Sequence, residues 1–226
     1  MKTQVIIAAG GTGERMKCAV PKPLLLLAGV PIVVRTVTVF AAHPGIAGII
    51  LVVNEAHIGA YKLALGTAGF GQKVNIIPGG KTRTQSVRMG LRELDADTGM
   101  VLVHDAVRPF VTARMIDEGL AWGCRERAAV AAVPVKPTLK VVDPRTLVVK
   151  ETLDRSLIWE IQTPQVFERA LLEQAYQGDV TASDDAALVE AIGCKVKVFL
   201  GDYKNIKITT PEDMVIAEAL LKEVAS

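Results

Sequence analysis

The sequence lacks the features that would place the chain in a membrane or hold it together with disulfides. Its 226 residues include only three cysteines, Cys18, Cys124 and Cys194, which lie far apart and form no Cys-x-x-Cys pair. Such a small, dispersed and odd-numbered set argues against a disulfide framework or a zinc site, and it fits a reducing cytoplasm. The apolar run before Gly10 is only five residues long, and no stretch approaches the length of a membrane span. We therefore expect a cytoplasmic globular protein without a membrane partner.

A strong charge of one sign is also absent. Lys and Arg together number 26 and Asp and Glu 24, for a formal net charge of +2. This balance provides no broad basic surface, so any basic patch must be local. We expect no nucleic-acid partner. Because half of the residues are hydrophobic, a chain of this length can bury a sizeable core without disulfides.

Short apolar runs that alternate with helix-period segments predict the fold class. The runs are rich in β-branched residues and apolar on both faces, which is typical of covered parallel strands. They are Val5–Ile7, Ile49–Val53, Val74–Ile77, Val101–Val103, Val130–Val133 and Val196–Phe199. The helix-period segments are Ile32–Ala42, Thr82–Leu94, Ile116–Arg125, Asp184–Ala191 and a last helix capped by Thr210. This alternation predicts an α/β fold with a mostly parallel, Rossmann-like sheet and helices on both faces.

Residues 137–157 interrupt this alternation of predicted strands and helices. Two β-rich segments, Thr138–Val142 and Thr146–Lys150, flank an Asp143-Pro144 turn and predict a β-hairpin. The hairpin is either an added edge of the sheet or an arm that reaches a partner subunit. No repeat or linker marks a domain boundary, so we predict a single domain over residues 1–226 with the hairpin inserted.

A glycine-rich turn, Ala8 to Met16, follows the first predicted strand, where backbone N–H groups can approach phosphates closely. Met16 stands where the dinucleotide fingerprint needs its third glycine, and the Gly-Lys-Ser/Thr ending of a P-loop is absent. Two prolines delay the next helix. Arg15 and Lys22 are therefore predicted to lie on an extended loop over the strand ends, where open α/β sheets bind ligands. The alternative is a plain turn with two solvated cations.

Several motifs together resemble the nucleotidyltransferases of the sugar-nucleotide type. The matching segments, in chain order, are Ala8–Met16, Pro21–Lys22, Gly79–Val87 (GGxxRxxSV), Val103–Pro109 (VHDAARP, with Val107 for alanine), Thr163–Gln165 and Asn205–Asp213. The resemblance covers essentially the whole chain in the right order. The Gly79–Val87 segment is similar to the one that recognises the cytosine nucleotide.

Two cytidylyltransferase families share these motifs, one acting on methylerythritol phosphate and the other on ribitol 5-phosphate. Pro134–Lys140 and Thr152–Trp159 resemble the PVxDTxK and TxDRxxLW segments of the methylerythritol family. Against this, the glycine-rich loop is one residue longer than usual, as in the ribitol type. Pro23 and Pro137 also replace the usual glutamine and aspartate. The methylerythritol family is the main interpretation; the ribitol family and a nucleotide-binding module without turnover remain the alternatives.

The main resemblance implies transfer of CMP from CTP to 2-C-methyl-D-erythritol 4-phosphate, with release of pyrophosphate, in non-mevalonate isoprenoid precursor synthesis. A phosphate oxygen attacks the α-phosphorus of CTP, so positioning and fixed cations do most of the catalysis. The sequence contains no Gly-x-Ser-x-Gly elbow and no candidate Cys/His pair for a protein nucleophile. The residues implied as catalytic are Arg15, Lys22, Lys207 and Arg155.

The same resemblance implies the binding residues. Those for the nucleotide are Ala8, Ala9, Gly10, Gly11, Gly79, Gly80, Arg83 and Ser86. Those for the polyol phosphate are Asp105, Arg108, Thr138, Arg155, Thr163 and Ser183. Asp105 is also implied as a ligand of magnesium, the expected cofactor. In the family the hairpin residues act in the neighbouring subunit's site, so we expect a homodimer.

Four of these residues have simpler interpretations. Asp105 also reads as a turn or capping aspartate, and Arg108 as its buried partner. Ser86 also reads as a residue of the first turn of a helix. The Ser183-Asp184-Asp185 run reads as an N-cap followed by acids in the first helical turn, which favour the positive helix end.

Overall fold

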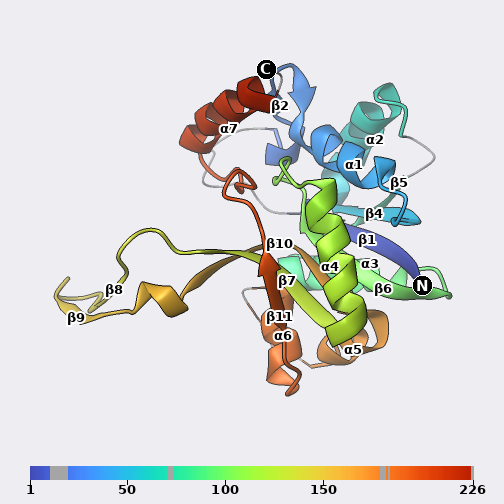
Figure 1. Ribbon diagram of the computed structural model, residues 1–226. Coiled ribbons are helices and arrows are strands. Elements are labelled where there is room, and N and C mark those ends of the chain that lie inside the picture. Colours follow the sequence, from blue (N-terminus) through green and yellow to red (C-terminus); the bar gives the residue numbers. More distant parts are fainter. Residues whose placement is uncertain (11–19, 71–73, 179–181, 183, 225–226) are drawn as a thin grey trace.

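A computed structural model describes residues 1–10, 20–70, 74–178, 182 and 184–224 (Figure 1). At its centre is a seven-stranded sheet in the order β11-β7-β10-β6-β1-β4-β5. The strands are β1 (Lys2–Ala8), β4 (Gly48–Val53), β5 (Val74–Pro78), β6 (Thr98–Asp105), β7 (Ala128–Pro134), β10 (Trp159–Glu168) and β11 (Lys197–Leu200). Within this sheet, strand β10 is antiparallel to both β6 and β7, and the other described pairings are parallel. The prediction of a mostly parallel α/β sheet is confirmed.

Helices cover both faces of this sheet because its strands are apolar on both sides. Along β1, Val5 and Ile7 belong to one core cluster and Ile6 to another. Successive side chains of a strand point to opposite faces, so each cluster needs its own cover. Helices α1, α2 and α4 cover the first cluster, and α3, α5 and α6 the second. The helices are α1 (Ile32–Ala42), α2 (Ile58–Thr67), α3 (Arg83–Arg92), α4 (Ala113–Glu126), α5 (Arg169–Ala175), α6 (Asp185–Ala191) and α7 (Pro211–Val224).

Smaller elements complete the fold. Helix α7 packs through Ala217 on a third cluster that includes Leu27 and Ile208. The short elements are the 3-10 helices η2 (Lys22–Leu24), η3 (Glu55–His57) and η4 (Arg155–Leu157) and the strands β2 (Leu26–Leu27) and β3 (Val30–Pro31). No helix among the described residues is long and apolar enough to cross a bilayer.

Side-chain caps mark where α3 and α4 begin. Thr82 accepts a hydrogen bond from the Gln85 amide and Thr112 one from the Met115 amide, so α3 and α4 begin directly after them. Helix α1 has the predicted bounds, whereas α4 begins three residues before the predicted Ile116. Helices α2 and α5 and strand β10 were not predicted.

The hairpin forms an arm that projects from the body (Figure 1). Strands β8 (Lys140–Val142) and β9 (Val149–Thr152) pair as a separate two-stranded sheet, so they are not an edge of the main one. The predicted hairpin is confirmed, and it is not an added edge of the main sheet; its reach to a partner subunit stays a prediction. The chain leaves the main sheet at Pro134 and returns at Trp159, and these two residues are register partners.

Candidate active site

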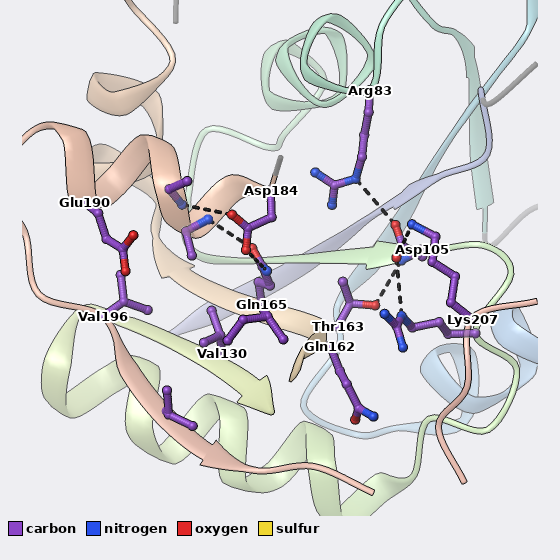
Figure 2. A pocket seen from close by; sticks show the side chains of 15 residues that line it. Arg83, Asp105, Val130, Gln162, Thr163, Gln165, Asp184, Glu190, Val196 and Lys207 are labelled. Atoms are coloured by element: carbon purple, nitrogen blue, oxygen red, sulfur yellow. Dashed lines mark hydrogen bonds and ion pairs between the residues drawn. The ribbon is translucent and has the colours of Figure 1, made fainter. Parts of the chain in front are cut away.

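Two adjoining pockets lie where β1 and β6 end. The first has a volume of about 270 Å³ and is lined by Ala8, Ala9, Gly10, Lys22, Pro23, Lys81, Arg83, Ser86, Asp105, Val107, Lys207 and Thr209. The second has a volume of about 430 Å³ and extends past Thr163 and Gln165 toward α6 (Figure 2). Arg83, Asp105 and Lys207 line both pockets, so they form a shared wall. The carboxyl ends of strands are where open α/β sheets bind ligands.

Asp105, the last residue of β6, is the centre of this wall. Its side chain is 9% exposed and faces three cations: Lys207 Nζ at 3.0 Å, Arg108 Nε at 3.3 Å and Arg83 Nε at 3.4 Å. Burial alone would raise the pKa of Asp105, but Lys207, Arg83 and Arg108 hold that pKa below its ordinary value. The carboxylate is therefore ionised at neutral pH, and the wall as a whole carries net positive charge that suits phosphate groups.

The first pocket is built from backbone on one side and from the start of α3 on the other. Gly79 donates its amide to Val53 O at 2.7 Å, and a Cβ at this position would lie 2.8 Å from Ser86 Oγ. Only glycine lets the strand end approach α3 so closely. Ser86 lies in the first turn of α3, where its hydroxyl donates to Thr82 O at 2.9 Å, and it also lines the pocket. The helix N-terminus adds partial positive charge on the pocket side.

A buried histidine, His104, is hydrogen-bonded to residues that line the second pocket. His104 Nε2 lies 3.1 Å from the Arg108 carbonyl oxygen, which can only accept, so Nε2 carries the proton. His104 Nδ1 then accepts from the Thr163 hydroxyl at 2.9 Å, and Thr163 Oγ1 accepts from the Asp105 amide at 3.2 Å. Burial lowers the pKa of His104 to about 4, so the ring is neutral at neutral pH. The network ties Asp105, Thr163 and Arg108 to one another.

Most predicted site residues line one of the two pockets. Those at the first pocket are Ala8, Ala9, Gly10, Lys22, Arg83, Ser86, Asp105 and Lys207, and those at the second are Arg83, Asp105, Arg108, Thr163 and Lys207. Gly79 and Gly80 lie directly behind, against Ser86 and Gln85. Arg15, Gly11 and Ser183 lie outside the described residues. These placements leave the individual binding roles as predictions.

Three predicted residues differ from the rest: Arg108 lines the second pocket but is buried, and Thr138 and Arg155 lie outside both pockets. Arg108 is buried and donates to Asp105 and, at 2.8 Å, to Asn205 O, so its interpretation as a buried partner of Asp105 is confirmed. Thr138 and Arg155 lie on the exposed arm and are not among the described residues that line either pocket. Arg155 donates to Lys136 O at 2.9 Å.

Sequence reasoning missed several residues of the site. Lys81 lines the first pocket beside the recognised Gly80, and Gln165 lines the second beside the recognised Thr163. Asp184 was expected as an acid of the first helical turn but is itself the N-cap of α6, because its side chain accepts from the Ala187 amide; Ser183, the expected cap, lies outside the described residues. Asp185 does lie in the first turn of α6, as expected, but its carboxylate has a further role that the sequence did not indicate. Asp185 is completely buried and binds Arg83, 102 residues earlier in the chain, a contact that no local pattern signals.

The carboxylates at the two pockets could supply only a small part of the ligands of a magnesium ion. Within the described parts of the chain no three His, Cys, Asp or Glu side chains cluster as a metal cage. Magnesium is commonly held by one or two carboxylates together with substrate phosphates. Asp105 is the acidic side chain shared by both pockets, so the donor set fits an ion carried mainly by a bound triphosphate.

Comparisons with known proteins agree with this geometry. Residues 3–223 match the family IspD, described as 2-C-methyl-D-erythritol 4-phosphate cytidylyltransferase. A protein of that name from Geobacter metallireducens is 40% identical over 231 residues, with 99% of each chain covered. Another from Alkaliphilus oremlandii is 41% identical, with 98% of this chain and 95% of the relative covered.

Solved structures give the same result. The 4-diphosphocytidyl-2C-methyl-D-erythritol synthase of Anaerococcus prevotii superposes with a TM-score of 0.86 at 31% identity, covering 98% of this chain and 96% of that one. The 2-C-methyl-D-erythritol 4-phosphate cytidylyltransferase of Thermus thermophilus superposes with a TM-score of 0.80 at 30% identity, covering 98% of this chain and all of that one.

The fold, the paired pockets and these likenesses define an α/β nucleotidyltransferase. The near-complete match then decides between the two polyol phosphate families that the motifs left open. The chain belongs to the family of 2-C-methyl-D-erythritol 4-phosphate cytidylyltransferases.

Proposed function

We propose that this enzyme transfers the CMP group of CTP to 2-C-methyl-D-erythritol 4-phosphate. A phosphate oxygen of the polyol forms a bond to the α-phosphorus of CTP, the bond from that phosphorus to the β-phosphate bridging oxygen breaks, and pyrophosphate leaves. The product is 4-diphosphocytidyl-2-C-methyl-D-erythritol, an intermediate of isoprenoid precursor synthesis.

The observation that carries this proposal is the wall shared by the two pockets. Two anionic substrates must be brought together while negative charge spreads over the reacting phosphorus. Arg83, Asp105 and Lys207 border both pockets and place two cations and one carboxylate between them. The glycine-lined first pocket suits the nucleotide, because backbone groups can approach a base and phosphates there. The second pocket suits the polyol, whose hydroxyls can reach Thr163 and Asp105.

Catalysis in this arrangement depends on fixed charge. Lys22 and Lys207 line the first pocket, where ammonium groups can stabilise the α-phosphate as the new bond forms. Asp105 holds Lys207 in place at 3.0 Å. Arg15 is proposed to bind the β- and γ-phosphates that leave.

We further propose a magnesium ion, bound chiefly by the triphosphate, with Asp105 as its candidate protein ligand. Such an ion neutralises phosphate charge when bound. We also propose that the enzyme is cytoplasmic, because three dispersed cysteines without a Cys-x-x-Cys pair fit a reducing compartment.

A homodimer in which the arm acts on a second copy is also part of the proposal. The arm exposes a row of apolar side chains that its own chain does not cover: Val141, Val142, Leu147, Val148 and Val149. Exposed apolar groups in such number are typical of an interface. Thr138 and Arg155 would then bind the polyol phosphate in the partner's second pocket.

The test is pyrophosphate release from CTP and magnesium, with 2-C-methyl-D-erythritol 4-phosphate and ribitol 5-phosphate offered in parallel. Turnover with the first compound alone is expected. Turnover with ribitol 5-phosphate alone would reject the proposed substrate, and turnover with neither would reject the proposed reaction.

A further inference from the structure

Arg83 occupies the border between the two pockets and is held by two carboxylates. Its Nε donates to Asp105 at 3.4 Å, and its Nη2 donates to Asp185 at 2.7 Å. The contact to Asp185 is the shorter one, within the range of charge-assisted hydrogen bonds, whereas the contact to Asp105 is long. Figure 2 shows the Arg83 side chain reaching from α3 toward Asp105 at the pocket wall. Asp185 is therefore the tighter of the two attachments.

Asp185 lies behind the site. It is 0% exposed and is not among the described residues that line either pocket. Its two oxygens are both engaged, because Oδ2 accepts from Arg83 and Oδ1 accepts from the Tyr176 hydroxyl. A buried carboxylate is costly unless it is paired and hydrogen-bonded, and here both conditions are met.

Tyr176 completes this attachment from the end of α5. Its side chain is buried, and burial together with the Asp185 charge raises the pKa of its hydroxyl above the ordinary value. The hydroxyl therefore stays protonated and donates to Asp185 at any working pH. Burial alone would lower the pKa of Arg83, but Asp185 and Asp105 raise it, so the guanidinium stays charged.

The helix that carries Asp185 is itself fixed to the site. Gln165 donates to Asp184 Oδ2 at 2.8 Å and accepts from the Ala186 amide at 3.1 Å. Gln165 lies on β10 two residues after Thr163, which lines the second pocket. Two hydrogen bonds thus attach the start of α6 to β10, the strand whose Thr163 lines the second pocket.

We propose that Asp185 and Tyr176 are positioning residues that hold the Arg83 guanidinium in place for the triphosphate of CTP. An arginine side chain has several rotatable bonds, and ordering them on binding costs affinity. Attachment to a buried carboxylate orders the side chain beforehand and leaves the weaker contact to Asp105 free to yield to a phosphate. This inference rests on the proposed function only in taking CTP as the ligand.

The test is the Kd for CTP, measured by calorimetry, which does not require turnover. Asp185→Asn is expected to weaken CTP binding about 10-fold and Tyr176→Phe about 3-fold, as hydrogen bonds that orient a charged contact are lost. The matched control is Glu173→Gln, which removes the carboxylate of another arginine pair at 2.7 Å, outside both pockets. It should leave the Kd within about 2-fold of the wild type.

A coupling measurement separates positioning from general support of the fold. In an Arg83→Gln background, Asp185→Asn and Tyr176→Phe should cause no further loss of CTP affinity, since the group they position is gone. Equal losses in both backgrounds would overturn the proposal, and so would an unchanged Kd in Tyr176→Phe. If Asp185→Asn fails to fold, Tyr176→Phe alone decides. A wild type that binds CTP yet releases no pyrophosphate would reject the proposed function and leave this inference standing.

Discussion

At the scale of single residues, the site is governed by one carboxylate among three cations. Asp105 is almost fully buried, yet Lys207, Arg83 and Arg108 keep it ionised. Its role toward Lys207 is to hold a long, flexible side chain at the junction of two pockets. Lys207 is 41% exposed, so this ion pair adds little to stability, and in the proposed function its value lies in placing the lysine for catalysis.

Lys207→Ala should therefore reduce kcat by roughly 10²- to 10³-fold, as expected when one preorganised charge at the transition state is removed. Pyrophosphate release at saturating substrates measures this. The matched control is Lys204→Ala, which removes a lysine that pairs with Glu223 at the surface. If both variants lose kcat equally, the loss does not come from the wall.

His104 makes a pH prediction. The ordinary pKa of 6.5 applies to the unfolded chain, and burial lowers it to about 4 in the folded one. As the pH falls from 6.5 toward 4, His104 becomes protonated in the unfolded chain but stays neutral in the folded one. The free energy of unfolding should thus decrease by on the order of 3 kcal/mol over this window and show no such change above it.

Urea denaturation at several pH values checks this dependence. His104→Gln removes the titrating ring, so its stability should fall less steeply between pH 6.5 and 4 than that of the wild type. Parallel curves would show that another group is responsible.

The placement of single residues at the pockets was predictable from sequence where a recognised motif carries them. Ser86 follows the glycines of one motif and Lys22 follows the glycine-rich turn after the first strand, and both line the first pocket. Asp185 could not be found in this way. Its partner Arg83 comes from a different helix, and two consecutive acids at a helix start look alike until packing buries one of them.

At the scale of elements, the strands that were predicted are those with short, nearly continuous apolar runs. Strand β10 was missed because Gln162, Thr163, Pro164 and Gln165 interrupt its apolar pattern. Of these, Gln162, Thr163 and Gln165 are polar yet buried; all three line the second pocket, and Gln165 also donates to Asp184 at the start of α6. The polar residues that β10 places at the pocket thus removed the apolar pattern by which a strand is predicted. The arm was found because its turn and its two β-rich segments are local features.

The arm carries the next prediction. Arg155→Ala should raise the KM for 2-C-methyl-D-erythritol 4-phosphate about 10- to 100-fold, the effect of losing a charged hydrogen bond to phosphate. The KM for CTP should change little, because Arg155 is not among the described residues that line the first pocket. Steady-state kinetics with each substrate varied in turn gives both values. Arg145→Ala, at the exposed end of the same arm, is the control and should match the wild type. A raised KM for CTP instead would reject the assigned role.

At the scale of the whole molecule, the question is whose site the arm serves. If each site combines the body of one subunit with the arm of the other, two defective variants can restore one another. Arg155→Ala and Lys207→Ala, coexpressed with different tags, should give a mixed dimer with one intact site and one doubly defective site.

With random pairing, half of the dimers are mixed and half of their sites are intact. Activity at low polyol phosphate should therefore recover to about one quarter of the wild type. An arm that serves its own subunit would give no recovery. Sedimentation velocity on the same samples checks that the dimer is present.

The root of the arm has a further consequence. Pro134 and Trp159 face one another in the sheet, and the Val135 amide donates to Ile158 O at 3.0 Å just beyond them. The main sheet thus holds the two ends of the arm together, and this does not depend on how many residues lie between Pro134 and Trp159. An insertion with such a closed base can be shortened, extended or exchanged for the arm of a relative while the catalytic body folds unchanged. The arm is therefore a natural junction for building chimeras, in which, on the proposed dimer, polyol selectivity and subunit pairing would be exchanged together while the nucleotide pocket stays intact.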